Sequence, residues 1–161
     1  MIKFKNLSLN LPYVRFKNEY ENAISKNQKN IEAISISSYS KNLDEVNSRF
    51  VNLKILDNKE FIFFSNYNSP KSIEFEFNDQ IAALLFWPTT NIQIRMKAKI
   101  KKTTPEYNQL YFLKRSSEKN ALAISSYQSK PIDSYSQVKE NYKKSLKNDD
   151  LKKCPEFWGG Y

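Results

Sequence analysis

Residues 48–71 constrain the fold of this chain more than any other stretch, because they combine strand, turn and helix signals. Two runs rich in aromatic and β-branched residues are typical of strands and are separated by the turn signal Asp57-Asn58. A helix start follows at Ser69 and Pro70, since serine is favoured as an N-cap and proline at the first helical position. The stretch therefore predicts a β-hairpin that leads into a helix N-terminus.

Three basic residues accompany this hairpin and helix start. Arg49 and Lys54 lie in the first predicted strand, and Lys71 lies in the first turn of the predicted helix. A helix N-terminus among cations favours anions, because its free N–H groups and its dipole both attract negative charge. The sequence therefore predicts a cradle for a phosphorylated ligand.

The residue types that the chain lacks exclude several kinds of site. Its only glycines are Gly159 and Gly160, so no glycine-rich phosphate loop can form, and side chains with a helix N-terminus must hold any nucleotide. It has no histidine, which excludes Ser-His-Asp triads and zinc sites that use histidine. Its only cysteine, Cys154, excludes an internal disulfide and a cysteine-rich metal site, and predicts a reducing, cytoplasmic location.

The formal net charge of +9 favours anionic partners such as nucleic acid, an anionic membrane surface or phosphorylated small molecules. The lysines are spread along the chain, so a solvated basic surface is favoured over a nucleic-acid footprint. No apolar run reaches the roughly 18 residues of a membrane span, and residues 1–10 lack the apolar core of a signal peptide. We therefore expect a soluble protein without a membrane partner.

The chain on both sides of the hairpin shows further helix and strand patterns. Residues 11–26 have apolar side chains at helical spacing, and residues 31–38 alternate as in a strand. The continuous apolar run 81–87 is typical of a buried strand. Residues 92–100 alternate so that one face would lie in the core and the other would be polar.

Further helix starts are predicted at Thr104, which precedes Pro105, and at Ser134, which opens a capping box with Gln137. Antiparallel hairpins with helices between and after them favour a β-barrel or strongly curled sheet with helices packed outside. The lack of alternating βαβ units disfavours a Rossmann fold. The length is that of a single domain.

Several motifs occur in an order and at spacings that match one family. They are S-R-F-V-N-L-K (48–54), F-F-S-N-Y-N-S-P-K (63–71), A-A-L-L-F-W (82–87), Q-I-R (93–95), Y-F-L-K-R (111–115), A-I-S-S-Y-Q-S (123–129) and P-E-F-W-G-G-Y (155–161). P-Y-V-R-F (12–16) and N-I-E-A-I-S-I-S (30–37) match the opening helix and first strand of that family. Each motif alone is weak, but by the ordered set the chain resembles the pyridoxamine 5′-phosphate oxidases, FMN enzymes of the split-barrel fold.

The resemblance implies a fold that is mainly β with α, an antiparallel Greek-key split β-barrel with peripheral helices. It implies one FMN-binding domain over residues 1–161, with an N-terminal helix over 11–26, a barrel core over 31–129 and a C-terminal helix and tail over 134–161. It also implies a homodimer with FMN at the interface.

The resemblance further implies which residues contact the cofactor and the substrate, and it assigns no catalytic residue. The implied FMN contacts are Arg49, Phe50, Val51, Asn52, Leu53, Lys54, Phe64, Ser65, Ser69, Lys71, Gln93, Gln128 and Ser129. The implied contacts of the substrate phosphate are Lys54, Tyr111, Arg115 and Lys119. Arg49 and Lys71 would meet the FMN phosphate, and Gln93 would hydrogen-bond the isoalloxazine edge. Tyr111 and Arg115 are four residues apart on a predicted helix and would share a face.

Three features depart from the family pattern. Pro70 stands where the family has an arginine for the FMN phosphate, so a guanidinium and one backbone N–H are lost. Lys119 stands where the family has a serine for the substrate phosphate, which keeps a donor and adds charge. Family members continue for several tens of residues past W-G-G-Y (158–161), with cofactor and substrate residues, including a histidine, in that segment.

The implied function is an FMN-dependent oxidoreductase resembling pyridoxamine/pyridoxine 5′-phosphate oxidase, in which hydride passes from a phosphorylated substrate to flavin N5 and then to oxygen. The alternative is a non-catalytic protein that binds flavin or pyridoxal phosphate, and a basic nucleic-acid-binding barrel is a third, less favoured hypothesis. On composition alone, Arg49 would be a solubility residue of an edge strand and Gln93 an exposed polar residue. Tyr111 with Arg115 would then be a surface helical pair.

Overall fold

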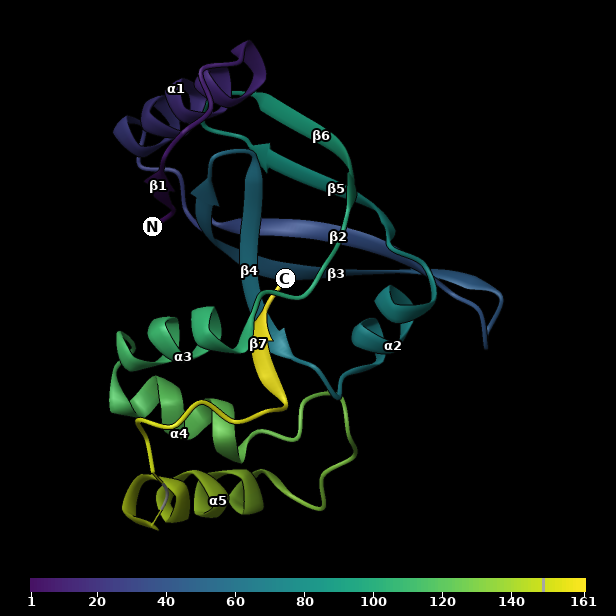
Figure 1. The fold of residues 1–161 in the computed structure, drawn as a ribbon, viewed down its shortest axis with the longest axis vertical. Helices are drawn as coiled ribbons and strands as arrows, with labels where there is room; N and C mark the ends of the chain where they lie inside the picture. The colour runs from purple at the N-terminus through teal and green to yellow at the C-terminus, as the bar shows by residue number, and fades with distance from the viewer. Residues whose placement is uncertain (149) are drawn as a thin grey trace. The chain divides into compact units, whose positions relative to one another are not determined.

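Residues 1–148 and 150–161 are described by the structure, a computed structural model in which seven strands and five helices follow one another along these ranges (Figure 1). The elements are β1 (Lys3–Lys5), α1 (Leu11–Ser25), β2 (Ala33–Ser40), β3 (Glu45–Asp57), β4 (Glu60–Asn66), α2 (Pro70–Phe77), β5 (Gln80–Trp87), β6 (Ile92–Lys99), α3 (Pro105–Leu113), α4 (Ser117–Ser125), α5 (Tyr135–Asn148) and β7 (Trp158–Gly160). No helix in the described ranges has the length and apolar character needed to cross a membrane.

The chain divides into two compact units, one of residues 1–64 and 74–101 and the other of residues 65–73 and 102–161. The first unit is built on an antiparallel sheet with the strand order β6-β5-β2-β3-β4, to which β1 adds by parallel pairing with β3. Residues paired across antiparallel strands lie on the same face of a sheet. One row on the inner face therefore joins Arg49, Ile36 and Ala83.

Aromatic side chains of α1 and of the sheet form the core of the first unit. Phe16 lies edge-on to Phe61 with ring centroids 5.1 Å apart, and its ring centroid is 5.8 Å from that of Trp87. The Trp87 indole is buried and donates Nε1–H to the Ile31 carbonyl at 3.1 Å. Buried aromatic rings supply much of the apolar area of a core. The helix predicted over 11–26 is thus confirmed as α1, and its apolar stripe covers the inner face.

The strand predicted at 81–87 is confirmed as β5. Within one copy of the chain, only one face of this strand is buried. Ala83, Leu85 and Trp87 are buried, whereas Leu84 is 40% and Phe86 54% exposed. An antiparallel sheet can leave one of its faces to solvent, and the outer face of β5 is not covered by other described residues of this chain. In β6 the predicted alternation is present, but its inner side chains are only half-buried or exposed.

Apolar side chains gather on this outer face. Phe50, Leu84 and Phe86 are 75%, 40% and 54% exposed. Phe50 and Leu84 both pair with Ser35, and Phe86 pairs with Gln93, so these side chains share one face of the sheet. We call Phe50, Leu84 and Phe86 the outer-face patch.

The second unit consists of α3, α4, α5 and β7 together with residues 65–73. Figure 1 shows α3, α4 and α5 stacked beside one another. The predicted helix starts are confirmed, because the Thr104 hydroxyl accepts from the Tyr107 N–H and the Ser134 hydroxyl accepts from the Gln137 N–H, both at 3.2 Å. The helix α4 and the short strands β1 and β7 are elements that the sequence patterns did not predict.

Asn108 fixes β7 within the second unit. The buried Asn108 accepts from the Gly160 N–H at 2.8 Å through Oδ1 and donates to the Tyr67 hydroxyl at 3.1 Å through Nδ2. A Cβ atom on Gly159 would collide with both Tyr67 and Asn108, so this close approach requires glycine. The contact positions Trp158, the first residue of β7, for its part in the candidate site.

Candidate functional site

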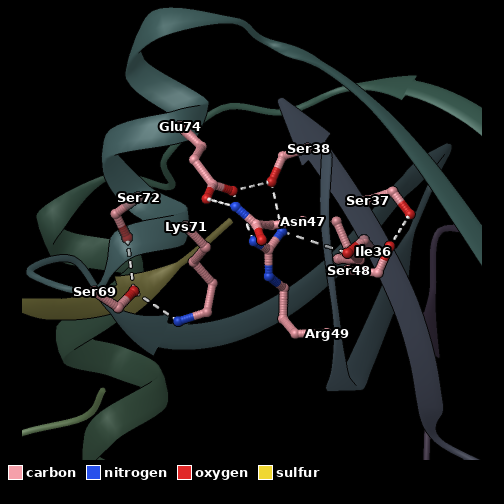
Figure 2. Close-up of polar contacts among 10 residues, drawn as sticks. All are labelled: Ile36, Ser37, Ser38, Asn47, Ser48, Arg49, Ser69, Lys71, Ser72 and Glu74. Carbon is pink, nitrogen blue, oxygen red and sulfur yellow. Dashed lines mark hydrogen bonds and ion pairs between the residues drawn. The ribbon is translucent and has the colours of Figure 1, made fainter. Parts of the chain in front are cut away.

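The structure brings four predicted cofactor residues together at the start of α2. Lys71 Nζ donates to Ser69 Oγ at 2.6 Å and to Gln128 Oε1 at 3.4 Å. Ser65 Oγ donates to the same Gln128 oxygen at 3.4 Å. We call Ser65, Ser69, Lys71 and Gln128 the Lys71 cluster, and Figure 2 shows Lys71 directed at Ser69. An ammonium, two hydroxyls and a carboxamide are therefore grouped in one place, although Gln128 is 63 residues from Ser65 in the sequence.

Local hydrogen bonds hold this helix start in place. The Ser69 hydroxyl donates to the Asn66 carbonyl at 2.7 Å, and the Ser69 carbonyl accepts from the Ser72 N–H at 2.9 Å. Ser69 and Ser72 are fully buried, and Lys71 is 7% exposed. A buried ammonium surrounded by ordered donors and acceptors is a suitable group for a phosphate, because charge-assisted hydrogen bonds are short and strong in such surroundings.

A second polar group lies on the inner face of the first unit, around Arg49. Arg49 Nη2 donates to Glu74 Oε2 at 2.7 Å, and Nη1 donates to Ser38 Oγ at 2.5 Å and to the Ile36 carbonyl at 3.4 Å. Ser38 Oγ also donates to Glu74 Oε2, and Asn47 Nδ2 donates to Glu74 Oε1 at 3.1 Å. We call Ser38, Asn47, Arg49 and Glu74 the Arg49 cluster; its contacts are drawn in Figure 2.

Arg49 keeps hydrogen-bonding capacity for a ligand. A guanidinium carries five N–H donors in a fixed plane. The contacts to Ser38, Ile36 and Glu74 use three of them. Nε–H and one Nη2–H have no acceptor in the part of the chain that the structure describes. Arg49 could therefore bind an oxyanion without breaking its contacts to the protein.

Lys54, which the resemblance assigned to both cofactor and substrate, forms an ion pair with Glu32. Glu32 also accepts from the amino group of Met1. Lys54 lies where the pairing of β3 with β4 shifts register between Leu53 and Ile55. Both predicted cations of β3 are thus held by carboxylates of this chain.

The remaining predicted cofactor residues lie in different surroundings. The Leu53 side chain is 1% exposed and belongs to the core, so only its backbone could meet a ligand. Phe50 and Gln93 lie on the outer face of the sheet, opposite to the face of Arg49. Ser129 is exposed and has a left-handed backbone, with φ of 65°. Half-buried or exposed side chains complete the set: Val51, Asn52 and Phe64.

Two of the four predicted substrate residues, Tyr111 and Arg115, meet at Trp158 in the second unit. The Arg115 guanidinium lies over the Trp158 ring, with Cζ 4.6 Å from the centroid, and Tyr111 stacks on the same ring at 6.4 Å. Arg115 Nε donates to Asn120 Oδ1 at 2.9 Å, and Nη2 donates to the Lys119 carbonyl at 2.7 Å. We call Tyr111, Arg115, Asn120 and Trp158 the Trp158 platform. Lys119 contributes its carbonyl here, and its side chain is exposed.

The prediction that Tyr111 and Arg115 share a face of one helix is wrong. The helix α3 ends at Leu113, and Arg115 lies in the turn that precedes α4. Its N–H donates to the Phe112 carbonyl at 3.1 Å, which is the pattern of a tightened helix end. The two side chains meet because both contact the Trp158 ring rather than because of helical spacing.

Burial shifts the acid–base behaviour of these side chains. It raises the pKa of Tyr111, with a smaller opposite influence from Arg115, and it lowers the pKa of Arg115. Burial also raises the pKa of the Cys154 thiol, so that the thiol stays protonated at neutral pH and is a poor nucleophile. Tyr111 is therefore a neutral hydrogen-bonding group at physiological pH.

Several residues of the candidate site carry no local sequence signal. Ser38 reaches Arg49 through the register of β2 on β3, and Glu74 reaches it from α2. Asn47 contacts Glu74, and Asn120 reaches Arg115 from a helix that was not predicted. The Trp158 ring is buried against Phe112 and lies under Arg115. Across residues 1–148 and 150–161 there is no group of three or more acidic or cysteine side chains that could hold a metal ion.

A groove of about 490 Å³ lies in the first unit beside α1 and β6. Phe16, Phe61 and Met96 are among the residues that line it, with Arg15 among its basic ones. Gln93 is the one predicted cofactor residue among those lining it. None of the residues that line the groove belongs to the Lys71 cluster or to the Arg49 cluster.

Comparison with curated proteins identifies similar sequences. The chain is 32% identical over 151 residues to pyridoxine/pyridoxamine 5′-phosphate oxidase 1 of Hydrogenovibrio crunogenus, and the match covers 93% of this chain and 69% of that protein. It is 32% identical over 152 residues to pyridoxine/pyridoxamine 5′-phosphate oxidase of Coxiella burnetii, covering 93% of this chain and 76% of that protein. No family model matches the chain.

Solved structures show the same fold. PhzG from Burkholderia lata, solved in complex with tetrahydrophenazine-1-carboxylic acid, matches with a TM-score of 0.85 and 19% identity over 93% of this chain and 74% of that one. A pyridoxamine 5′-phosphate oxidase-related, FMN-binding protein from Nostoc punctiforme matches with a TM-score of 0.72 and 11% identity over 90% of this chain and 78% of that one. The expected fold class, the FMN-binding split barrel with peripheral helices, is thereby confirmed.

Proposed function

We propose that this chain, which belongs to the pyridoxine/pyridoxamine 5′-phosphate oxidase family, binds FMN and oxidises a phosphorylated small molecule. The observation that carries this proposal is the Lys71 cluster, in which a buried ammonium, two hydroxyls and a carboxamide converge at a helix start. That donor set suits a phosphate monoester, and the chain builds it without a glycine loop.

The donor chemistry of the chain fits FMN. In the second unit, Lys71, Ser69 and Gln128 would offer hydrogen-bond donors to a phosphate. In the first unit, Arg49 would offer its two remaining N–H groups to an oxyanion. When bound, FMN would accept hydride from the substrate and pass the electrons to oxygen. The chain would contribute binding, orientation and phosphate neutralisation.

We further propose a homodimer, with FMN bound at the interface. The outer-face patch supports this, because large exposed apolar groups on one sheet face are typical of protein–protein contacts. Gln93 lies on the face of the outer-face patch, whereas Arg49 lies on the opposite face of the sheet. In a dimer, Gln93 of one copy and Arg49 of the other would contact the same cofactor. A two-fold contact would pair the patch with itself.

Replacing Phe86 with aspartate is expected to weaken the dimer by about tenfold or more, because a buried phenylalanine contributes about 1.5–3 kcal/mol and the symmetric contact places the change on both copies. Sedimentation equilibrium of the full chain measures the effect. The matched control is Leu9→Asp, since Leu9 is 90% exposed and lies outside the patch. Equal association of wild type, Phe86→Asp and Leu9→Asp would reject the outer-face patch as the dimer contact.

The Trp158 platform is the proposed contact for the substrate phosphate. Arg115 supplies the cation, and Tyr111 supplies a neutral hydroxyl. The Trp158 ring and Asn120 hold the guanidinium in place, which reduces the entropy lost when a ligand binds. Lys119, on the exposed surface next to Arg115, would add positive charge.

A second candidate is a non-catalytic protein that binds flavin or pyridoxal phosphate. The observation that favours it is that Arg115 is already engaged by Asn120, the Lys119 carbonyl and the Trp158 ring. In that case the guanidinium would serve the fold of the second unit. Turnover decides between the two candidates, because only the oxidase forms an aldehyde from pyridoxamine 5′-phosphate.

The decisive experiment is a visible absorption spectrum of the purified full chain, with and without added FMN, followed by an assay with pyridoxamine 5′-phosphate. The expected result is a yellow protein with a flavin spectrum and formation of aldehyde. A flavin spectrum without aldehyde would favour the binding protein. A chain that retains no FMN at micromolar concentration would reject the oxidase and the flavin-binding protein, and a chain that also fails to bind pyridoxal phosphate would reject the second candidate entirely.

A further inference from the structure

We infer that Glu74 is a specificity-determining residue for the cofactor phosphate, because it fixes Arg49 in place and at the same time offsets its positive charge. The inference rests on the proposed function, since it takes Arg49 as a contact of the FMN phosphate. The proposed function assigns a role to the cation Arg49, and the inference adds a role for the carboxylate of Glu74.

The contacts of Glu74 leave its carboxylate little freedom. Oε2 accepts from Arg49 Nη2 at 2.7 Å and from the Ser38 hydroxyl, and Oε1 accepts from Asn47 Nδ2 at 3.1 Å. The Glu74 side chain is 6% exposed and that of Arg49 is 21% exposed. Three donors from β2 and β3 therefore hold a carboxylate of α2 in a largely dry environment.

Arg49 is in turn fixed by the same group. Its Nη1 contacts to Ser38 and Ile36 and its Nη2 contact to Glu74 define the plane of the guanidinium. The remaining N–H groups, on Nε and Nη2, then point in directions set by that plane. Glu74 thus determines where an oxyanion can meet Arg49.

The negative charge of Glu74 offsets the positive charge of Arg49, which would attract an anion. Arg49 and Glu74 form a pair with no net formal charge, so a phosphate dianion at the free N–H groups is attracted by the guanidinium and repelled by the carboxylate behind it. Unit charges separated by about 6 Å in a partly buried site change an equilibrium constant by tenfold or more. A neutral flavin without a phosphate would be indifferent to this charge.

The substitution Glu74→Gln separates charge from geometry. The carboxamide oxygen can still accept from Arg49 and Ser38, while its NH₂ group would face Asn47. The Asn47 amide can turn over and present its oxygen to that group, because amide O and N have nearly the same shape. The network then keeps its hydrogen bonds, and its net charge becomes more positive by one unit because the carboxylate is gone.

The experiment compares FMN with riboflavin, titrated against the full chain by flavin fluorescence at two salt concentrations. We expect Glu74→Gln to bind FMN about tenfold more tightly than wild type, with a steeper salt dependence, and to bind riboflavin with unchanged affinity. The double variant Glu74→Gln with Asn47→Asp returns a carboxylate to the cluster, and its ratio of FMN to riboflavin affinity should fall back toward the wild-type value.

The matched control is Glu76→Gln, which makes the same change of charge on the same helix at an exposed position. It should leave the ratio of FMN to riboflavin affinity at the wild-type value. A Glu74→Gln ratio that is unchanged or lowered would overturn the inference and leave Glu74 a structural ion-pair partner. Wild-type protein that binds neither flavin would instead reject the proposed function, and this inference with it.

Discussion

Replacing Lys71 with methionine is expected to weaken FMN binding roughly 10- to 150-fold, because a charge-assisted hydrogen bond contributes about 1.5–3 kcal/mol. Lys71 is 7% exposed, so water cannot easily replace its contact to a phosphate. Methionine has a similar length and fills the space of the lysine stem without its charge. Riboflavin, which has no phosphate, should bind with nearly unchanged affinity.

Flavin fluorescence titration of the full chain measures both affinities. The control is Lys147→Met, which removes one positive charge from the exposed surface of α5 and should change the FMN affinity by less than about twofold in physiological salt. If Lys71→Met and Lys147→Met bound FMN equally well, the phosphate would lie elsewhere. A parallel loss of riboflavin affinity would instead indicate that the variant disturbs the fold of the Lys71 cluster.

The hairpin and the helix start at its end could be predicted because their signals are local. The predicted turn follows Asp57 and contains Asn58, which has the left-handed φ of 52° that asparagine tolerates. The helix α2 begins at Pro70, where proline loses no hydrogen bond. Signals of this kind do not depend on the rest of the chain, so the structure retains them.

The partners of the predicted cations could not be read from the sequence. Glu74 lies 25 residues from Arg49, and Glu32 lies 22 residues from Lys54. Each contact follows from the register of β2 on β3 and from the course of the chain into α2. The sequence therefore identified the cations of the candidate site but not the carboxylates that offset them.

The outer face of β5 shows a different limit of the sequence patterns. A continuous apolar run indicates burial without specifying what provides it. In this chain Leu84 and Phe86 are exposed, and Phe50 of β3 shares their face. The run is explained if a second copy covers the patch, which is the outcome that the Phe86→Asp experiment tests.

Replacing Arg49 with methionine is expected to lower the free energy of unfolding by about 3–5 kcal/mol, because removal of one partner leaves a buried carboxylate without its counter-ion. The Glu74 side chain is 6% exposed and would keep only Ser38 and Asn47 as donors. For a chain of this size the loss corresponds to a melting temperature lower by about 6–20 °C. Thermal unfolding followed by circular dichroism, without added flavin, measures it.

The double variant Arg49→Met with Glu74→Gln should recover most of that stability, since the uncompensated charge is removed while Ser38 and Asn47 keep a hydrogen-bonding partner. It should still bind FMN more weakly than wild type, because the Arg49 donors are gone. Recovered stability without recovered affinity would show that the ion pair serves the fold and the guanidinium serves the ligand. If Arg49→Met unfolded at the wild-type temperature, the buried Glu74 carboxylate would not depend on Arg49, and Glu74 would not be the group that positions the guanidinium.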